Sequence, residues 1–103
     1  MLILTHDDFS PHLNTTFTVA TPGLEPQEWE LVDVKVYSID SIPAYLKPKR
    51  VPFVLVFRGP ADPLVPEQIH TLRHAAMGEH EIYTIPLGPL GQSDALFYQA
   101  AFN

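Results

Sequence analysis

Two histidines spaced four residues apart, His70 and His74, are the strongest candidates for chemistry in this sequence. On a helix they would share a face, and with Glu79 or His80 they could hold a metal ion. On a strand the two side chains point the same way but lie roughly 13 Å apart, too far to share an ion. The Glu that the zinc-protease motif requires after the first histidine is absent. We therefore expect no metal site and predict exposed histidines on a strand or turn.

Other polar groups that could support catalysis lack the necessary surroundings. Asp7 and Asp8 are adjacent, so their side chains diverge, and both suit the first turn of a helix. Ser10, Ser41 and Ser93 have no Gly-x-Ser-x-Gly setting. The absence of cysteine excludes thiol catalysis, disulfides and Cys-ligated zinc. We expect no catalytic residue and no cofactor, and an enzyme assembled from distant carboxylates and histidines remains a third alternative.

Length and composition predict one globular domain over residues 1–103. The 103 residues are 46% apolar and 17% charged, which is enough for one hydrophobic core. The net charge of −6 argues against binding to nucleic acid, because Lys47, Lys49 and Arg50 form the only basic cluster. No apolar run is long enough to span a membrane, and Met1–Asp8 lacks the basic region of a signal peptide. We expect a protein that is not secreted and contacts no membrane.

Short apolar runs separated by Pro and Gly predict an all-β domain. Residues 52–58 alternate, which puts Phe53, Leu55 and Phe57 on one face of a buried strand. Residues 28–38 predict a half-exposed antiparallel strand with Val32, Val34 and Val36 on one face. Further strands are expected over residues 15–19, 81–85 and 96–102. The predicted fold is a small antiparallel β-sandwich or barrel.

The N-terminal segment departs from this β pattern. Residues 6–13 predict one or two helical turns, because Thr5 to Asp8 has the form of a capping box and Pro11 prevents a longer helix. Phe9 and Leu13 are expected to point inward. Asn14 is a suitable helix stop, because Asn tolerates left-handed backbone geometry.

Residues 66–78 support two conflicting interpretations. Pro66 suits a helix start and Gly78 a helix stop, and Ile69, Leu72 and Ala76 have helical spacing. The alternative is a strand over residues 69–73 followed by a turn that ends at Gly78. The residues alone leave this choice open.

Three segments together resemble a family of small uncharacterised bacterial and phage-associated domains. They are Phe9-x-Pro11 leading to Thr16-Phe17, Pro52-Phe53 to Gly59-Pro60, and Tyr98-x-Ala100-x-Phe102-Asn103. In such sequences a Gly near position 78 separates two strands, so the resemblance implies an antiparallel β fold in which residues 69–73 and 81–85 form a hairpin. Members resemble companions of phage tail or phage-like particle genes, which implies a structural role in a virion or the cytoplasm. The family supplies no catalytic residues.

Aromatic residues on both faces of the predicted strands suggest a contact surface or a two-sided core. Trp29 and Tyr37 are two of them, and Phe97 falls on the opposite face from Tyr98. Tyr45 and Leu46 lie in a proline-stiffened segment that suits an arm reaching a neighbour. We therefore predict a non-enzymatic structural protein of a phage virion or phage-like particle, a homo-oligomer that contacts itself and other particle proteins through Tyr37, Tyr45, Leu46 and Phe97. The rival is a small β binding module for a peptide, sugar or metal.

Overall fold

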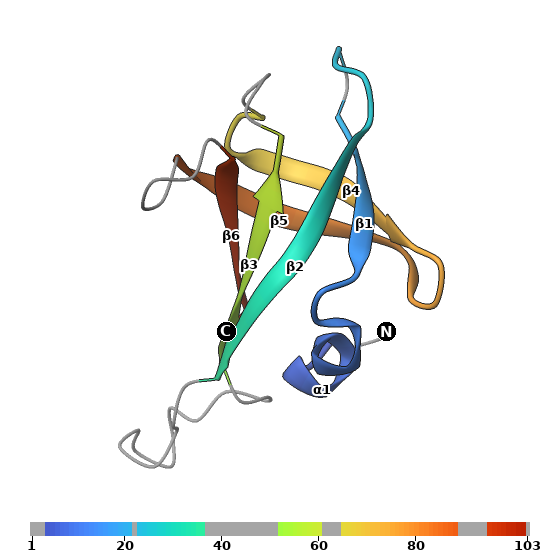
Figure 1. Cartoon of the computed structure of the whole chain (residues 1–103), viewed down its shortest axis with the longest axis vertical. Helices are drawn as coiled ribbons and strands as arrows, with labels where there is room; N and C mark the ends of the chain where they lie inside the picture. Colours follow the sequence, from blue (N-terminus) through green and yellow to red (C-terminus); the bar gives the residue numbers. More distant parts are fainter. Residues whose placement is uncertain (1–3, 22, 37–51, 61–64, 89–94, 103) are drawn as a thin grey trace.

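The computed structural model describes residues 4–21, 23–36, 52–60, 65–88 and 95–102, and these ranges form a closed β-barrel (Figure 1). The strand order around the barrel is β1-β2-β3-β6-β5-β4, with β1 pairing back onto β4, and every neighbouring pair is antiparallel. The prediction of a small antiparallel β-sandwich or barrel with a short N-terminal helix is confirmed, and the structure is the barrel of these two alternatives. The strands are β1 (Thr16–Ala20), β2 (Gln27–Val36), β3 (Phe53–Gly59), β4 (Gln68–His74), β5 (Gly78–Gly88) and β6 (Leu96–Phe102).

The conflict over residues 66–78 is resolved in favour of a β-hairpin. Strands β4 and β5 pair from Gln68↔Thr84 to His74↔Gly78, so the helical interpretation is wrong. Gly78 has a φ of +79°, a left-handed conformation that glycine adopts without steric cost at the end of the turn. The helical spacing of Ile69 and Leu72 carried no structural meaning, because Ile69 is exposed and Leu72 is buried.

The set of β2 side chains that point into the barrel changes partway along the strand. Its first half buries Trp29 and Leu31, and the register against β3 then shifts between Leu31 and Asp33. After this bulge, Val34 pairs with buried Leu55, and it packs against the core. The predicted common face of Val32, Val34 and Val36 is therefore wrong in part, because the extra residue of a bulge changes which side chains point inward.

The barrel interior is filled by large side chains. Phe53, Leu55 and Phe57 of β3 are fully buried, as the alternating pattern predicted. Tyr98 and Ala100 of β6 are buried beside them. Trp29 is also fully buried, so it belongs to the core rather than to a contact surface.

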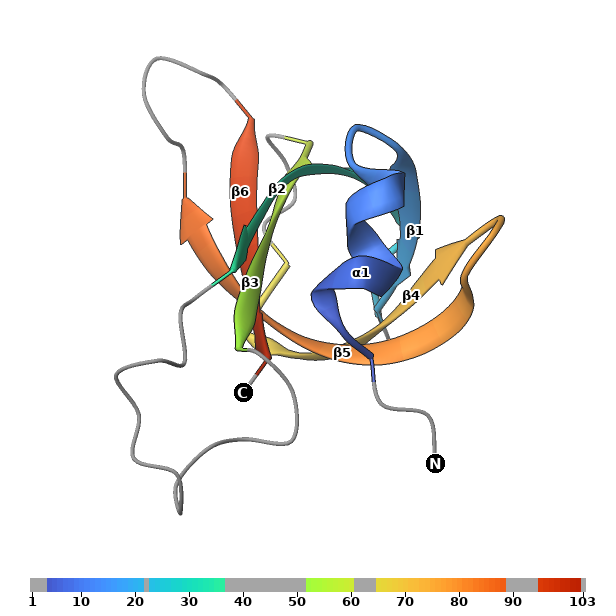
Figure 2. The ribbon, with the colours of Figure 1, turned by 90° about the horizontal axis from the view of Figure 1, so that it is seen from below.

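The N-terminal segment closes one end of the barrel (Figure 2). It contains the helix α1 (His6–Phe9) and a 3₁₀ turn (Ser10–His12), and Asn14 follows with a left-handed φ of +69°, as predicted. Phe9 is buried with its ring 5.7 Å from Phe102 and 5.9 Å from Phe53, centroid to centroid. Leu13, predicted to point inward, is instead 40% exposed, because the chain leaves the 3₁₀ turn there.

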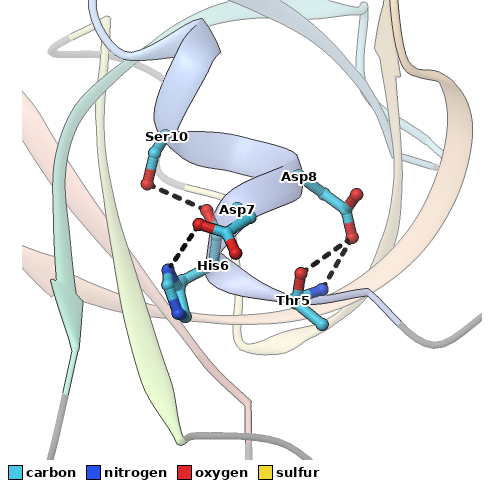
Figure 3. Close-up of polar contacts among 5 residues, drawn as sticks. All are labelled: Thr5, His6, Asp7, Asp8 and Ser10. Atoms are coloured by element: carbon cyan, nitrogen blue, oxygen red, sulfur yellow. Dashed lines mark hydrogen bonds and ion pairs between the residues drawn. The ribbon is translucent and has the colours of Figure 1, made fainter.

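The capping box predicted for this helix is present (Figure 3). The Asp8 carboxylate accepts hydrogen bonds from the Thr5 amide at 2.7 Å and from the Thr5 hydroxyl at 3.3 Å. The Asp8 amide in turn donates to the Thr5 carbonyl at 3.0 Å. His6 lies 3.3 Å from the Asp7 carboxylate, so both aspartates have a local structural role.

Candidate interaction surface

The two candidate metal-binding histidines lie inside the barrel, so the prediction that they are exposed is wrong. His70 is 1% exposed. Its Nε2 lies 2.9 Å from the Pro66 carbonyl, which only accepts, so Nε2 carries the proton. Its Nδ1 lies 3.0 Å from the Thr21 hydroxyl and accepts from it. Both ring nitrogens of His70 are therefore engaged by the protein itself.

His74 holds the tip of the β4–β5 hairpin to the N-terminal segment. Its Nδ1 accepts from the amides of Ala76 at 3.0 Å and Met77 at 3.4 Å. Its Nε2 must then carry the proton, and it donates to the Thr15 hydroxyl at 3.0 Å. The Thr15 hydroxyl in turn donates a hydrogen bond to the His12 carbonyl. Burial, followed by the neighbouring His12, lowers the pKa of His74, so the neutral ring is the form that fits this site.

Charged and histidine side chains do not converge elsewhere in the described ranges. No group of three His, Asp or Glu residues lies close enough to hold an ion there. His80, the third histidine considered with His70 and His74, bonds through Nε2 to the Met77 carbonyl at 2.8 Å. In the same ranges, no helix is long and apolar enough to cross a membrane.

The outer face of the β4–β5 hairpin exposes large apolar side chains. Ile69 is 60% exposed and Tyr83 is 47% exposed, and the two are directly paired across the strands. Leu87 is also exposed farther along β5, with half-buried Ile85 between it and Tyr83. We call Ile69, Tyr83, Ile85 and Leu87 the outer strip. An apolar strip on a small closed barrel is typical of a protein contact surface.

Acidic groups border this outer strip. The Tyr83 hydroxyl donates to the Glu67 carboxylate, and this bond, followed by burial, raises the pKa of the tyrosine. Glu79 pairs with Arg73 at 3.3 Å, and Glu81 is exposed beside them. A partner that covers the strip therefore meets a negative rim.

Of the four predicted contact residues, only Phe97 lies in the described ranges. It is half-buried on the outer side of β6, paired with Arg58 of β3 and Gly88 of β5. Tyr37, Tyr45 and Leu46 lie outside the described residues. Ile69 and Tyr83 were not predicted as contact residues, because the pairing of their two strands was not known while residues 66–78 were ambiguous. A strand over residues 69–73 would have placed Ile69 and His70 on opposite faces of the sheet.

Comparison with known proteins assigns the family. A family model described as a domain of unknown function, DUF6916, matches residues 4–102. No curated protein and no solved structure matches the chain. The match covers nearly the whole chain, and the protein therefore belongs to the DUF6916 family.

Proposed function

We propose that this chain is a non-enzymatic structural protein that acts through protein–protein contacts. In this proposal it is a component of a phage virion or phage-like particle, and copies of it contact one another and other particle proteins. It would then reside in the virion or the cytoplasm. The phage context rests on the resemblance of the three sequence segments described above.

The observation that carries this proposal is the exposed cross-strand pair Ile69–Tyr83 on a barrel whose interior holds a cluster of large buried side chains. A domain that binds a small molecule needs a concave pocket with converging polar groups. Here Trp29, Phe57 and Tyr98 fill the interior, and His70 and His74 bond within the fold. Exposed apolar surface on a rigid scaffold favours a contact function.

The test is the molecular mass of the protein in solution and its recovery with particles. We expect the wild-type chain to form oligomers by light scattering at high concentration. Replacing both Ile69 and Tyr83 by Ser is expected to reduce that mass while circular dichroism stays unchanged. The control Val36→Ser removes an equally exposed apolar side chain from β2, outside the outer strip. A wild-type protein that stays monomeric and never co-purifies with a particle would contradict the proposal.

The predicted arm provides a second, independent variant. Tyr45→Ser with Leu46→Ser is expected to leave the fold intact and weaken association. If the double variant associates as strongly as the wild type, Tyr45 and Leu46 do not contribute to association, and the proposal then rests on the outer strip alone.

A further inference from the structure

The tip of the β4–β5 hairpin, residues 75–77, is joined to the N-terminal segment, residues 4–15, by one imidazole ring. The register of β4 against β1 covers residues 71–73, so His74 is the first residue of β4 past it. The Nδ1 atom of His74 accepts from the amides of Ala76 and Met77 in the tip. Its Nε2 atom lies 3.0 Å from the Thr15 hydroxyl of the N-terminal segment. The bonds of this ring therefore connect two parts of the chain far apart in the sequence.

A second histidine packs directly on the first. The ring of His12, from the 3₁₀ turn, lies 4.4 Å from the ring of His74, centroid to centroid. The Thr15 hydroxyl links the two residues, because it also donates to the His12 carbonyl. On β1, the Phe17 ring lies 4.6 Å from the His74 ring. A positive charge on His74 would therefore meet another histidine and an aromatic ring in a buried setting.

The other charged groups around His74 do not neutralise such a charge. Glu28 of β2, Arg73 of β4 and Glu79 of β5 border the hollow beside His74. Arg73 and Glu79 pair with each other at 3.3 Å. Within the described ranges, no carboxylate forms an ion pair with the ring of His12 or His74. A proton added to His74 therefore has no bonded counter-charge in this part of the chain.

Two further histidines lie on the elements that meet here, and their titration breaks no bond at the tip. The His80 Nε2 lies 2.8 Å from the Met77 carbonyl, which only accepts, so this nitrogen carries a proton in both charge states. His6 on α1 lies 3.3 Å from the Asp7 carboxylate, so a proton on His6 strengthens that pair. Histidine is the side chain that ordinarily changes charge between pH 8 and pH 5. A change at the tip over this range therefore points to His12 and His74.

Protonation of His74 is incompatible with the bonds that it makes. A proton on Nδ1 would face the N–H groups of Ala76 and Met77, which are donors themselves. Burial, followed by the neighbouring His12, lowers the pKa of His74 from its ordinary value of 6.5. A conformation in which the ring is freed from this setting binds the proton more readily, so its population rises as the pH falls.

The hairpin tip is the side expected to move, because the N-terminal segment has other attachments to the barrel. Phe9 is fully buried. The Asn14 amide donates to the Leu31 carbonyl at 2.7 Å, and the Leu31 amide donates to the Thr15 carbonyl at 3.0 Å. In the tip, Met77 is half-buried and packs against the core. Opening of the tip would therefore uncover this apolar side chain.

We propose that His12 and His74 form a pH-sensitive latch between the N-terminal segment and the tip of the β4–β5 hairpin, and that acidification releases the tip while the barrel stays folded. The latch goes beyond the proposed contact function and does not depend on it, because neither histidine belongs to the outer strip.

The experiment records histidine ring signals, backbone amide signals and hydrogen exchange of the whole chain from pH 8 to pH 5. The Ala76 and Met77 amide signals should shift with the same midpoint as the His74 ring. After correction for the intrinsic effect of pH, exchange at these two amides should accelerate about tenfold more than exchange at the amides of β3. The circular dichroism of the barrel should stay unchanged.

Three variants separate the latch from a purely structural role. His12→Gln removes the neighbouring charge, so the His74 midpoint should move up toward 6.5. His74→Gln should abolish the pH dependence of exchange at the tip. His80→Gln, the control on the same hairpin, should keep the wild-type midpoint and the wild-type acceleration.

Four outcomes would overturn the proposal. The first is that the Ala76 and Met77 signals do not follow the His74 titration. The second is equal acceleration of exchange at the tip and in β3, which would mean that acid unfolds the whole barrel. The third is an unchanged His74 midpoint in His12→Gln, and the fourth is an unchanged pH dependence at the tip in His74→Gln. The mass measurement for the contact function uses different residues, so either proposal can fail while the other stands.

Discussion

Trp29 and Tyr98 stack face to face across β3, with ring centroids 4.0 Å apart and planes inclined by 9°. They come from β2 and β6, the two neighbours of β3, and they meet over Gly59. A Cβ at Gly59 would lie 2.8 Å from the indole and 3.1 Å from the phenol ring. The indole N–H donates to Gln27 at 3.0 Å, and the Tyr98 hydroxyl accepts from the Val65 amide at 3.1 Å. The stack is thus fixed at both ends.

Gly59→Ala should therefore destabilise the protein by about 1–3 kcal/mol, because the added methyl group overpacks the core. The measurement is a urea titration of the unfolding free energy. The double variant Gly59→Ala with Trp29→Phe makes room for the methyl group, so its loss should be smaller than the sum of the two single losses. Full additivity would show that the indole does not confine this position.

Phe57→Ala should cost about 3–5 kcal/mol, a large share of the stability of a small domain. The ring is fully buried and lies edge-on to Phe17 at 5.5 Å, so truncation leaves a cavity that the closed barrel cannot collapse to fill. Val36→Ala is the control, because Val36 is about half exposed and should change stability by only about 0.5 kcal/mol. A loss below roughly 1 kcal/mol for Phe57→Ala would contradict the assigned core face.

The sequence predicts those features of the structure whose physical cause lies within a single strand. The face of β3 follows from its own alternation, so Phe53, Leu55 and Phe57 were placed correctly. The bulge of β2 depends on register against β3, which no local pattern contains, so the inward face of Trp29 and Leu31 was missed.

The two buried histidines show a second limit of prediction from the sequence. Local rules place histidine on the surface, and His70 is buried only because Thr21 and Pro66 supply partners for both ring nitrogens. Thr21 lies 49 residues away in the sequence, and only the closure of β1 onto β4 brings it near. For the candidate surface, the outward orientation of Phe97 could be predicted, whereas Ile69 and Tyr83 required the hairpin to be known.

The stability of the protein should fall as the pH decreases below about 6.5, because of His74. Burial and His12 lower its pKa in the folded state, so the unfolded chain binds a proton more readily than the folded one. The contribution of the neutral ring is therefore complete above 6.5, the ordinary value, and is lost as the pH falls toward the lowered value. Protonation would remove the acceptor for the Ala76 and Met77 amides and place a charge beside His12.

The measurement is the free energy of unfolding from pH 8 to pH 5 for the wild type and for His74→Gln. The variant should be less stable at pH 8 and should show a weaker decline on acidification. His80→Gln is the control, because the described partner of that ring is the Met77 carbonyl within the same hairpin. An identical pH dependence in wild type and His74→Gln would exclude His74 as the cause.

Zinc should not bind His70 and His74 together. The two side chains point into the same interior, but they are four residues apart on one strand, so their Cα atoms are separated by roughly 13 Å, beyond the reach of one ion. Each ring also uses both nitrogens in hydrogen bonds, and a metal ion would have to break one of these bonds in a buried setting.

Calorimetric titration with zinc is therefore expected to show no stoichiometric submicromolar site. The variants Thr15→Val and Thr21→Val each free one ring nitrogen, and they should lower stability by about 1–3 kcal/mol without creating such a site. A tight one-to-one zinc complex that disappears in His70→Gln and in His74→Gln would contradict the separation of the two rings by the strand.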